Sequence, residues 1–239
     1  MKANDAAAHF LKSVPCFADV NSRTLATLSM RCRPRRLAAR QLLFVEGDPC
    51  QDLHILVDGH VNTYRASAEG REQIVRVFDR PGNTFCIPAV FTVGRNIVTA
   101  RTMAETSLYL IDRATVVDVV RKNPSVALKL VIAVGDETKK AIDLVESLSL
   151  KPTKVRLAKF LYERALAEGA CRGKGIRLTR DRLREEDVAS TVGTVRVHVS
   201  RSLQSLARAG AIVLERGAIH IPDLMALGRA VEETHHLSD

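Results

Sequence analysis

The 239-residue sequence has no long apolar run. Its longest stretch without a charged side chain is Pro81–Gly94, which has 14 residues and contains two prolines, whereas a membrane-spanning helix needs about 20 apolar residues. The N-terminus also lacks the continuous apolar segment of a secretory signal. We therefore predict that the protein does not cross a membrane and stays in the cytoplasm.

Cysteine is scarce and scattered. The five cysteines are Cys16, Cys32, Cys50, Cys86 and Cys171. Their number is odd, and no two of them form the closely spaced CxxC pair of a metal knuckle. The sequence therefore encodes neither a disulfide framework nor a cysteine-bound structural metal.

Acidic side chains are outnumbered by basic ones, with 27 Asp+Glu against 36 Lys+Arg and a formal net charge of +9. A surface with this excess attracts polyanions, and nucleic acid is the first candidate partner. Hydrophobic residues make up 46% of the chain and charged residues 26%, which is an ordinary globular composition. The length suits one large domain or two modest ones.

Residues 40–112 alternate short apolar segments with turn residues. Glycines mark the turns at Gly47, Gly59, Gly70, Gly82 and Gly94. Their spacing of about 11 or 12 residues is typical of a compact antiparallel sandwich or barrel. The clearest strands cover residues 53–57 and 74–78, and a short helix that begins after the cap-like Asn21 is predicted over residues 21–30.

A long helix is predicted from Asn123-Pro124 to about Leu148. Apolar or small residues recur along it at alternating intervals of four and three: Ala127, Val131, Val134, Thr138, Ala141, Val145 and Leu148. This spacing indicates a coiled-coil seam, and we predict a homodimer along it. The alternative is that the seam packs on the helix's own sheet. A second apolar face is available for that packing: Leu128, Leu130, Ile132, Ile142 and Leu144.

Lys151-Pro152-Thr153 breaks the long helix, so a domain boundary is predicted there and a new helix over residues 154–168. Further along, residues 184–206 fit two helices joined by a tight turn at Gly193. Arg196, Ser200 and Arg201 fall on the outer side of the second helix, in positions typical of a recognition helix in a DNA groove.

These side chains suit DNA chemically. Arginine forms paired hydrogen bonds to guanine, and serine contacts a phosphate or a base edge. The alternative is an ordinary helical hairpin with solvated arginines. After the second helix, residues 212–221 read as a two-stranded hairpin, which predicts a wing whose Arg216 contacts backbone phosphate.

In this order and spacing, the features resemble the cyclic-AMP receptor protein and FNR (Crp/Fnr) family of bacterial transcription regulators. The resemblance covers residues 10–222 and includes the glycine-marked segment Phe44–Asp48, the turn Pro81–Asn83, the hinge near Leu150–Thr153 and the motif Val192–Arg201. It implies homodimers that bind palindromic promoter sites in double-stranded DNA and adjust the recruitment of RNA polymerase in response to a signal.

The fold class that follows from these observations is α+β. We predict an N-terminal cupin-like antiparallel β-roll of the cyclic-nucleotide-binding type in residues 1–112. A dimerisation helix is predicted in residues 113–150, and a C-terminal winged helix-turn-helix domain in residues 151–239.

The recognition helix departs from the family pattern. Where the family usually carries Arg-Glu-Thr-Val, this chain has Arg196-Val197-His198-Val199. Val197 cannot accept a hydrogen bond from cytosine but can contact a thymine methyl group, so we expect a shifted operator sequence. Val195 replaces the family's usual capping residue, which leaves Thr194 as the nearest candidate cap.

The roll departs more strongly. Cyclic-nucleotide binders of the family hold the phosphate with a Gly-Glu-Leu turn and an Arg-Ser pair, and the corresponding positions here are Cys86-Ile87-Pro88 and Ile97-Val98. A buried phosphate would lack its positive partner. The hydroxyl pair that meets adenine aligns with Ala141 and Ile142. We therefore expect a different effector in this pocket, or none, and not cyclic AMP.

Other sensor chemistries remain as alternatives. An iron–sulfur cluster would need four converging thiolates, which the wide cysteine spacing disfavours. Haem could be held by Cys86, His54 or His60, and Cys86 could be a redox thiol. A cupin-type metalloenzyme is a remote alternative, because only His54 and His60 are offered as ligands in the roll and Glu46 lies in a loop. We predict no catalytic site and no metal site.

Overall fold

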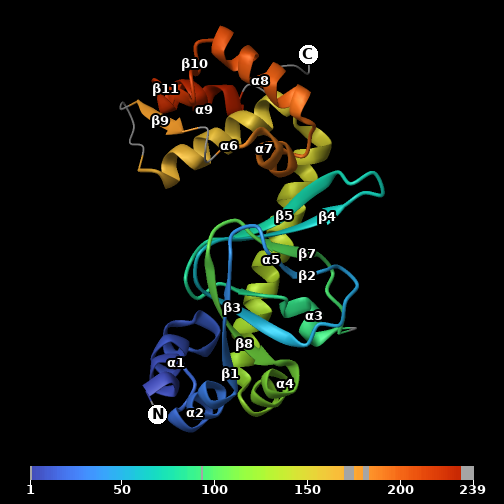
Figure 1. Ribbon diagram of the computed structural model, residues 1–239, viewed down its shortest axis with the longest axis vertical. Coiled ribbons are helices and arrows are strands. Elements are labelled where there is room, and N and C mark those ends of the chain that lie inside the picture. Colours follow the sequence, from blue (N-terminus) through green and yellow to red (C-terminus); the bar gives the residue numbers. More distant parts are fainter. Residues whose placement is uncertain (1, 93, 170–174, 180–182, 233–239) are drawn as a thin grey trace. The chain divides into compact units, whose positions relative to one another are not determined.

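The computed structural model describes residues 2–92, 94–169, 175–179 and 183–232 (Figure 1). The chain divides into two compact units, one formed by residues 1–67 and 74–141 and the other by residues 68–73 and 142–239. Within the described residues, no helix is at once long enough and apolar enough to span a bilayer.

The first unit contains two four-stranded sheets, with strand orders β1-β8-β3-β6 and β2-β7-β4-β5. The strands are β1 (Cys32–Leu37), β2 (Leu42–Phe44), β3 (Asp52–Asp58), β4 (Val61–Ala66), β5 (Glu72–Phe78), β6 (Thr84–Phe85), β7 (Thr99–Thr102) and β8 (Thr106–Asp112). Neighbours run antiparallel, as in β3 with β8 and β4 with β7. The predicted strands 53–57 and 74–78 lie within β3 and β5, so the antiparallel sheet prediction is confirmed.

The glycine-marked turns also occur where the sequence predicts them. Gly47, Gly59, Gly70, Gly82 and Gly94 all have positive φ. At Gly59, between β3 and β4, an added Cβ would overlap the backbone of Glu105 and Thr106. Since no side chain fits there, this glycine allows the β3–β4 hairpin to pass close to the start of β8.

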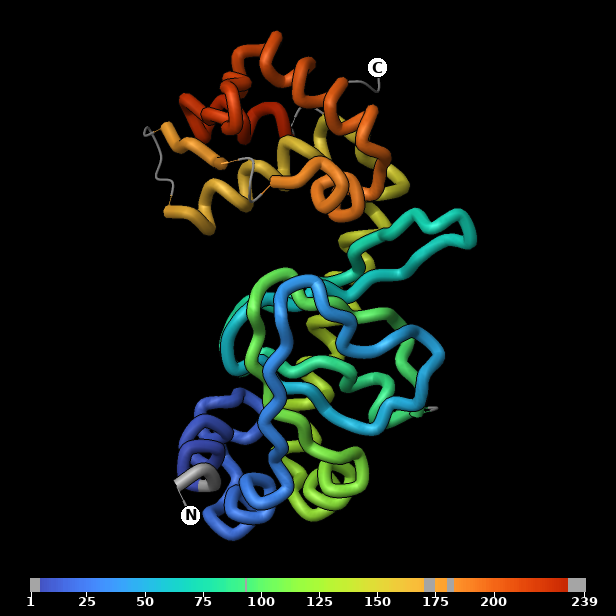
Figure 2. The backbone as a smooth tube through the Cα atoms, in the orientation of Figure 1, coloured from blue at the N-terminus to red at the C-terminus, as the bar shows by residue number. Residues whose placement is uncertain are grey.

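The helices of the first unit are α1 (Lys2–Ser13), the 3-10 helix η1 (Pro15–Phe17), α2 (Ser22–Arg31), α3 (Ile87–Phe91) and α4 (Arg113–Lys122). Leu11, Leu28 and Val116 share one buried cluster, and Figure 2 shows α1, α2 and α4 grouped together. The predicted short helix is α2, and its Asn21 cap accepts a hydrogen bond from the Thr24 amide at 2.8 Å.

The segment 113–150 contains two helices, α4 and α5 (Pro124–Leu150), rather than one. Asn123 separates them with φ −134° and ψ 89°, because a residue before proline is disfavoured in the helical conformation. α5 begins at the predicted proline and ends two residues beyond the predicted Leu148.

The prediction of a second, sheet-facing apolar stripe on α5 is wrong in part. Val126 and Leu130 are buried in the first unit. Three members of the predicted stripe are instead exposed: Leu128, Ile132 and Ile142. Leu130, another member of the predicted stripe, is buried together with Val126, so the helix packs through the side that carries these two residues.

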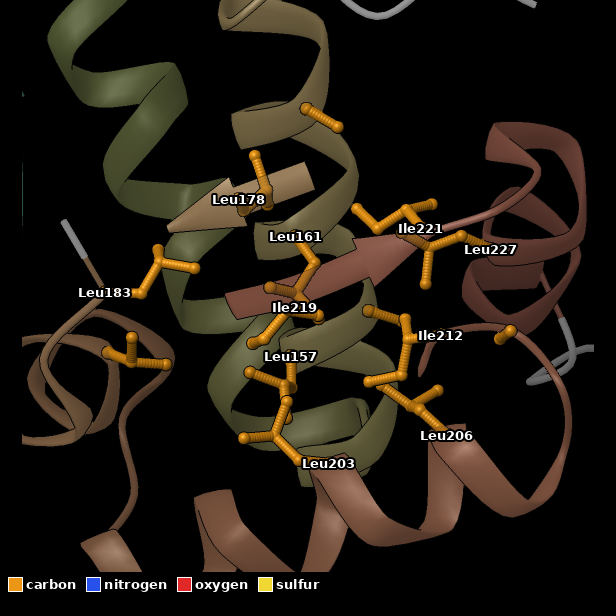
Figure 3. Packing of buried hydrophobic residues seen from close by; sticks show 14 of the residues in the cluster. Leu157, Leu161, Leu178, Leu183, Leu203, Leu206, Ile212, Ile219, Ile221 and Leu227 are labelled. Atoms are coloured by element: carbon orange, nitrogen blue, oxygen red, sulfur yellow. The ribbon is translucent and has the colours of Figure 1, made fainter. Parts of the chain in front are cut away.

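The second unit contains α6 (Thr153–Ala167), β9 (Ile176–Thr179), α7 (Glu185–Val192), α8 (Arg196–Arg208), β10 (Val213–Glu215), β11 (Ala218–Ile221) and α9 (Leu224–Glu232). Leu157 and Leu161 of α6, and Leu203 and Leu206 of α8, point toward Ile212 and Ile219 in one apolar core (Figure 3). The two helices, the turn and the hairpin are therefore as predicted. The third strand, β9, and the final helix, α9, have no counterpart in the sequence-based prediction.

Candidate DNA-binding surface and effector cavity

The turn between α7 and α8 is built from one glycine and a buried helix face. Val188, Ala189 and Val192 bury the inner side of α7. Gly193 has φ +75°, and its amide donates to the Ala189 carbonyl at 2.9 Å. The positive φ favours glycine at this position, and a Cβ there would force the side chain of Leu148 to move.

The outer face of α8 carries the candidate DNA-binding residues. Val199, Leu203 and Leu206 are buried, which fixes the rotation of the helix. The exposed side chains are Arg196, Val197, His198, Arg201, Gln204 and Arg208, and Ser200 is half-buried at the edge. Gln204 and Arg208 were not singled out from sequence. Their spacing of three and seven residues from Arg201 places them on the same face.

Arg196 is already paired within the unit. Its Nε donates to Glu185 Oε2 at 2.8 Å, and its Nη1 lies 3.4 Å from Glu186 Oε1. The hydrogen bond to Glu185 raises the pKa of the Arg196 guanidinium, which stays 67% exposed as a side chain. The two acidic residues belong to the first turn of α7, where carboxylates are favoured by the helix dipole.

The prediction of Thr194 as the helix cap is wrong. Val195 occupies the N-cap position of α8, and no side chain caps the helix. The Thr194 hydroxyl lies 3.4 Å from His198 Nδ1 instead of bonding a free backbone amide. Thr194 is half-buried at the turn. It therefore lies close to α8 but does not cap the helix.

Arg156 of α6 links the hinge to the turn, and no sequence pattern pointed to it. Its guanidinium donates to the carbonyls of Leu148 at 3.0 Å, Lys151 at 3.3 Å and Gly193 at 3.2 Å. Burial lowers the pKa of this group. The Arg156 side chain thus gives hydrogen-bond partners to carbonyls at the end of α5. It also holds Gly193, the residue of the turn between α7 and α8.

The wing is a three-stranded sheet in the order β10-β11-β9. Arg216 is exposed at the β10–β11 turn, next to Gly217 with φ +80°. Arg177 of β9 pairs with Glu215 at 2.6 Å, which joins the missed strand to the predicted hairpin. Arg216 is therefore placed where a phosphate can reach it.

The predicted dimer seam falls partly on the free face of α5. Val131, Thr138, Ala141 and Val145 are exposed, but Val134 and Leu148 are half-buried. Five exposed apolar residues that precede the end of the helix form what we call the α5 stripe: Leu128, Val131, Ile132, Ile142 and Val145. Their exposed fractions lie between 56% and 66%, which is unusual for large apolar side chains on one helix face.

A cavity of about 220 Å³ lies in the first unit, and it brings together Cys86, Ile97, Val98 and Ala141 of the predicted effector pocket. Two predicted members are placed elsewhere. Ile87 is 2% exposed in the core as the first residue of α3, and Ile142 is exposed on α5. The cavity walls are completed by aromatic and aliphatic side chains: Phe44, Val75, Phe78, Phe85 and Pro88.

Two charged residues in this wall were missed from sequence. Arg76 of β5 and Glu137 of α5 form an ion pair at 2.8 Å, with a second bond of 2.9 Å from Arg76 Nη2 to Glu137 Oε1. Arg76 is the single basic residue among the described lining residues. Its charge is thus already balanced by Glu137.

The histidines considered as metal or haem ligands have other partners. His54 is 6% exposed and packs between Phe44 and Phe85, with ring centroids 5.2 Å away on each side. Burial lowers the pKa of His54 to about 3, so its imidazole is neutral. His60 Nε2 lies 2.8 Å from Asn62 Oδ1. In the described part of the chain, no cluster of three His, Cys, Asp or Glu residues could hold a metal ion.

Comparison with known proteins matches both units to families. A model of the cyclic nucleotide-binding domain matches residues 34–123. A model of the Crp-like helix-turn-helix domain matches residues 155–230. The two matches cover the sheets of the first unit and the winged motif of the second.

Relatives align along most of the chain. A CRP-like cAMP-activated global transcriptional regulator of Mycobacterium tuberculosis is 26% identical over 213 residues, which are 89% of this chain and 94% of that protein. An anaerobic regulatory protein of Pasteurella multocida is 26% identical over 82% of this chain and 70% of its own length. The crystal structure of a transcriptional regulator assigned to the crp/fnr family from Eubacterium rectale shares the fold, with a TM-score of 0.76 at 21% identity, over 91% of this chain and 98% of that one.

Proposed function

The chain belongs to the Crp/Fnr family of transcription regulators, and we propose that it acts as a homodimer whose two α8 helices read an inverted repeat in promoter DNA. The observation that carries this proposal is the outer face of α8. There Arg196 and Arg201 flank an exposed Val197 while the opposite face is buried in the core.

The chemistry of that face supports sequence reading. Each arginine can donate two hydrogen bonds to a guanine, and Val197 can contact a thymine methyl group. Gln204 and Arg208 extend the face toward the backbone of the duplex, and Arg216 of the wing adds a phosphate contact.

The ion pair at Arg196 adds a selectivity step. To contact a guanine, Arg196 must leave Glu185 and Glu186. Non-cognate DNA lacks a guanine edge at the matching position, and these acidic residues repel its phosphates. The acidic first turn of α7 therefore favours cognate sites over random duplex.

The α5 stripe supports a parallel helix pair between two chains. Its members Val131, Ile142 and Val145, together with the exposed Thr138 between them, repeat at heptad-compatible intervals. Pairing two such faces would bury apolar surface that is otherwise in water. The proposed function requires the two recognition helices of the dimer to meet half-sites about 34 Å apart, which is one turn of DNA.

The cavity favours an effector other than a cyclic nucleotide. A phosphodiester placed there would compete with Glu137 for Arg76. The other described walls are mainly aromatic or aliphatic. A volume of about 220 Å³ is below the usual range for drug-sized ligands. We therefore expect a small, neutral and largely apolar occupant, or constitutive DNA binding.

We propose that the regulator acts in the cytoplasm, where it can meet promoter DNA and RNA polymerase. RNA polymerase is the partner on which bound dimers act. Binding of the M. tuberculosis relative's nucleotide, cAMP, is the competing hypothesis for the effector. Calorimetry with cAMP tests it directly, and our proposal expects no binding heat.

Selection of bound sequences from random DNA by the full chain tests the proposed function. The expected result is an inverted repeat whose half-sites lie about one helical turn apart. Selection of a single half-site, or of no consensus at low salt, would contradict the proposal. Arg201→Ala should lose affinity for the selected site far more than for scrambled DNA, while Arg229→Ala on α9 serves as a matched arginine control.

A further inference from the structure

The end of α5 lies in the same compact unit as the recognition helix. The main segment of the second unit starts at Ile142, so it contains Ile142 and Val145 of the α5 stripe together with α8. In a twofold dimer that pairs through this stripe, the position of α8 relative to α5 decides how far apart the two α8 helices lie. The contacts that hold α8 to α5 therefore decide which half-site spacing fits.

The attachment of α5 to the rest of this unit does not come from the apolar core. Every described member of the core that holds α6, α7 and α8 together lies at position 157 or later, so α5 contributes none of them. Along the chain, only Lys151 and Pro152 separate Leu150, where α5 ends, from Thr153, where α6 begins. A short link without a shared core would by itself leave α8 free to pivot against α5.

The guanidinium of Arg156 supplies the missing attachment. Its Nη1 donates to the carbonyls of Leu148 at 3.0 Å and Lys151 at 3.3 Å, and its Nη2 donates to the Gly193 carbonyl at 3.2 Å. Because both nitrogens belong to one rigid planar group, the end of α5 and the turn before α8 are held in one relative geometry. The carbonyl end of a helix also favours a nearby cation. We call these hydrogen bonds the Arg156 bridge.

Leu148 makes a second contact between α5 and the turn. A Cβ placed at Gly193 would collide with Leu148 Cδ2, so the leucine side chain rests against the glycine backbone. Leu148 is accordingly half-buried, although its spacing in the sequence predicts a place in the dimer seam. Its carbonyl and its side chain thus both tie the end of α5 to the turn.

The turn keeps its own conformation without the Arg156 bridge. The amides of Gly193 and Thr194 both donate to the Ala189 carbonyl at 2.9 Å, and the inner face of α8 is fixed in the apolar core. The bridge therefore acts on where the turn lies relative to α5, and the shape of the turn does not depend on it.

We propose that Arg156 is a positioning residue that sets the half-site spacing accepted by the dimer, an inference that rests on the proposed homodimer. One added base pair shifts the second half-site by about 3.4 Å and rotates it by about 35° around the duplex. A pivoting link between α5 and α8 would follow such a change, whereas the Arg156 bridge resists it. The bridge therefore makes the dimer selective for one spacing.

Spacing variants of the selected operator test this proposal. Affinities of the full chain are measured for that operator, for duplexes with one base pair inserted or removed between the half-sites, and for a half-site duplex. For the unsubstituted chain, either spacing change should weaken binding at least about 30-fold, because the second α8 no longer reaches its half-site. In Arg156→Lys this loss should shrink to about fivefold or less, because lysine offers one donor nitrogen in place of two. Affinity for the half-site should stay within about twofold, since the turn and α8 are unchanged.

Arg164→Lys, on the same helix, is the matched control. Arg164 pairs with Glu168 at 3.3 Å, and its replacement should leave the loss caused by altered spacing as it is in the unsubstituted chain. An undiminished spacing loss in Arg156→Lys would overturn the proposal. So would a half-site affinity that falls as far as the operator affinity, because Arg156 would then only support the fold.

Leu148→Ala keeps the proposal testable if Arg156→Lys does not fold. This change removes the side-chain contact with Gly193 and should also reduce the spacing loss, whereas an unchanged loss would overturn the proposal. Selection of no inverted repeat by the unsubstituted chain is a different result. It would contradict the proposed function itself, before any change at Arg156 is made.

Discussion

The two units differ in whether their charged and polar side chains are exposed or enclosed. In the second unit, the arginines of α8 are exposed and the leucines are buried, so the functional side chains are those that the core leaves out. In the first unit, Arg76, Glu137 and His54 are inside or in a cavity wall and are paired or stacked there. An exposed site can be read from helical spacing, whereas a cavity is defined by strands that are distant in sequence.

A charged substitution in the α5 stripe should reduce DNA binding by the second unit more than any other change considered. Val145→Asp should yield monomers, and affinity for the selected operator should fall roughly 100-fold or more because the two α8 helices no longer bind together. Sedimentation velocity measures the first effect and operator titration the second. Lys140→Glu, on another face of α5, should leave both unchanged. A dimeric Val145→Asp protein would refute the α5 stripe as the interface.

Removal of single arginines tests whether α8 reads bases. Arg196→Ala and Arg201→Ala should each weaken operator binding by roughly 1–3 kcal/mol and relax the preference at one base pair. Arg216→Ala should weaken all duplexes about equally, because it contacts phosphate. Uniform losses for all three variants, measured on operator and scrambled DNA, would show that α8 only positions the protein.

Acid should destabilise the first unit through His54. The pKa of His54 is about 3 in the folded chain against 6.5 for the free group, so the unfolded chain binds one more proton between these values. The free energy of unfolding therefore decreases as pH falls below 6.5, by about 1.4 kcal/mol per pH unit. Hydrogen exchange of the β3 amides at pH 7, 6 and 5 measures this decrease in the free energy of unfolding.

His54→Phe keeps an aromatic ring between Phe44 and Phe85 but cannot titrate. Its β3 amides should show a much flatter pH dependence, and His198→Gln, at an exposed position on α8, should behave like the unsubstituted chain. A pH dependence that survives in His54→Phe would show that another group is responsible.

The smallest predicted effect tests whether the acidic first turn of α7 contributes to selectivity for the operator. Glu185→Gln removes the nearer of the two carboxylates that pair with Arg196, and with it a charge that repels phosphate, so affinity for random duplex should rise by about twofold to fivefold at low salt. Operator affinity should change less, and the ratio of the two affinities should fall. An unchanged ratio would contradict a selectivity role for this ion pair.

The sequence predicts much of the fold for identifiable reasons. Turn glycines need positive φ, Pro124 marks a helix start, and the buried faces of α7 and α8 follow helical spacing. β9 could not be predicted in the same way, because its four residues, Ile176–Thr179, pair with β11 from 39 or more positions away. The same holds for Arg156, whose role depends on three carbonyls that only the folded unit brings together.

The effector cavity shows where motif comparison reaches its limit. The sequence correctly located Cys86, Ile97, Val98 and Ala141 in one place. It misplaced Ile87, which is buried in the core. It also misplaced Ile142, because aligning the family's adenine contact onto this helix does not reveal which way α5 is rotated.

The stoichiometry of the complex with selected operator DNA tests the central claim most directly. Sedimentation equilibrium of the full chain with a duplex that carries one inverted repeat should give two chains per duplex, and a half-site duplex should bind at least about 100-fold more weakly. One chain per full site with equal affinity for the half-site would contradict a homodimer that reads DNA through paired α8 helices.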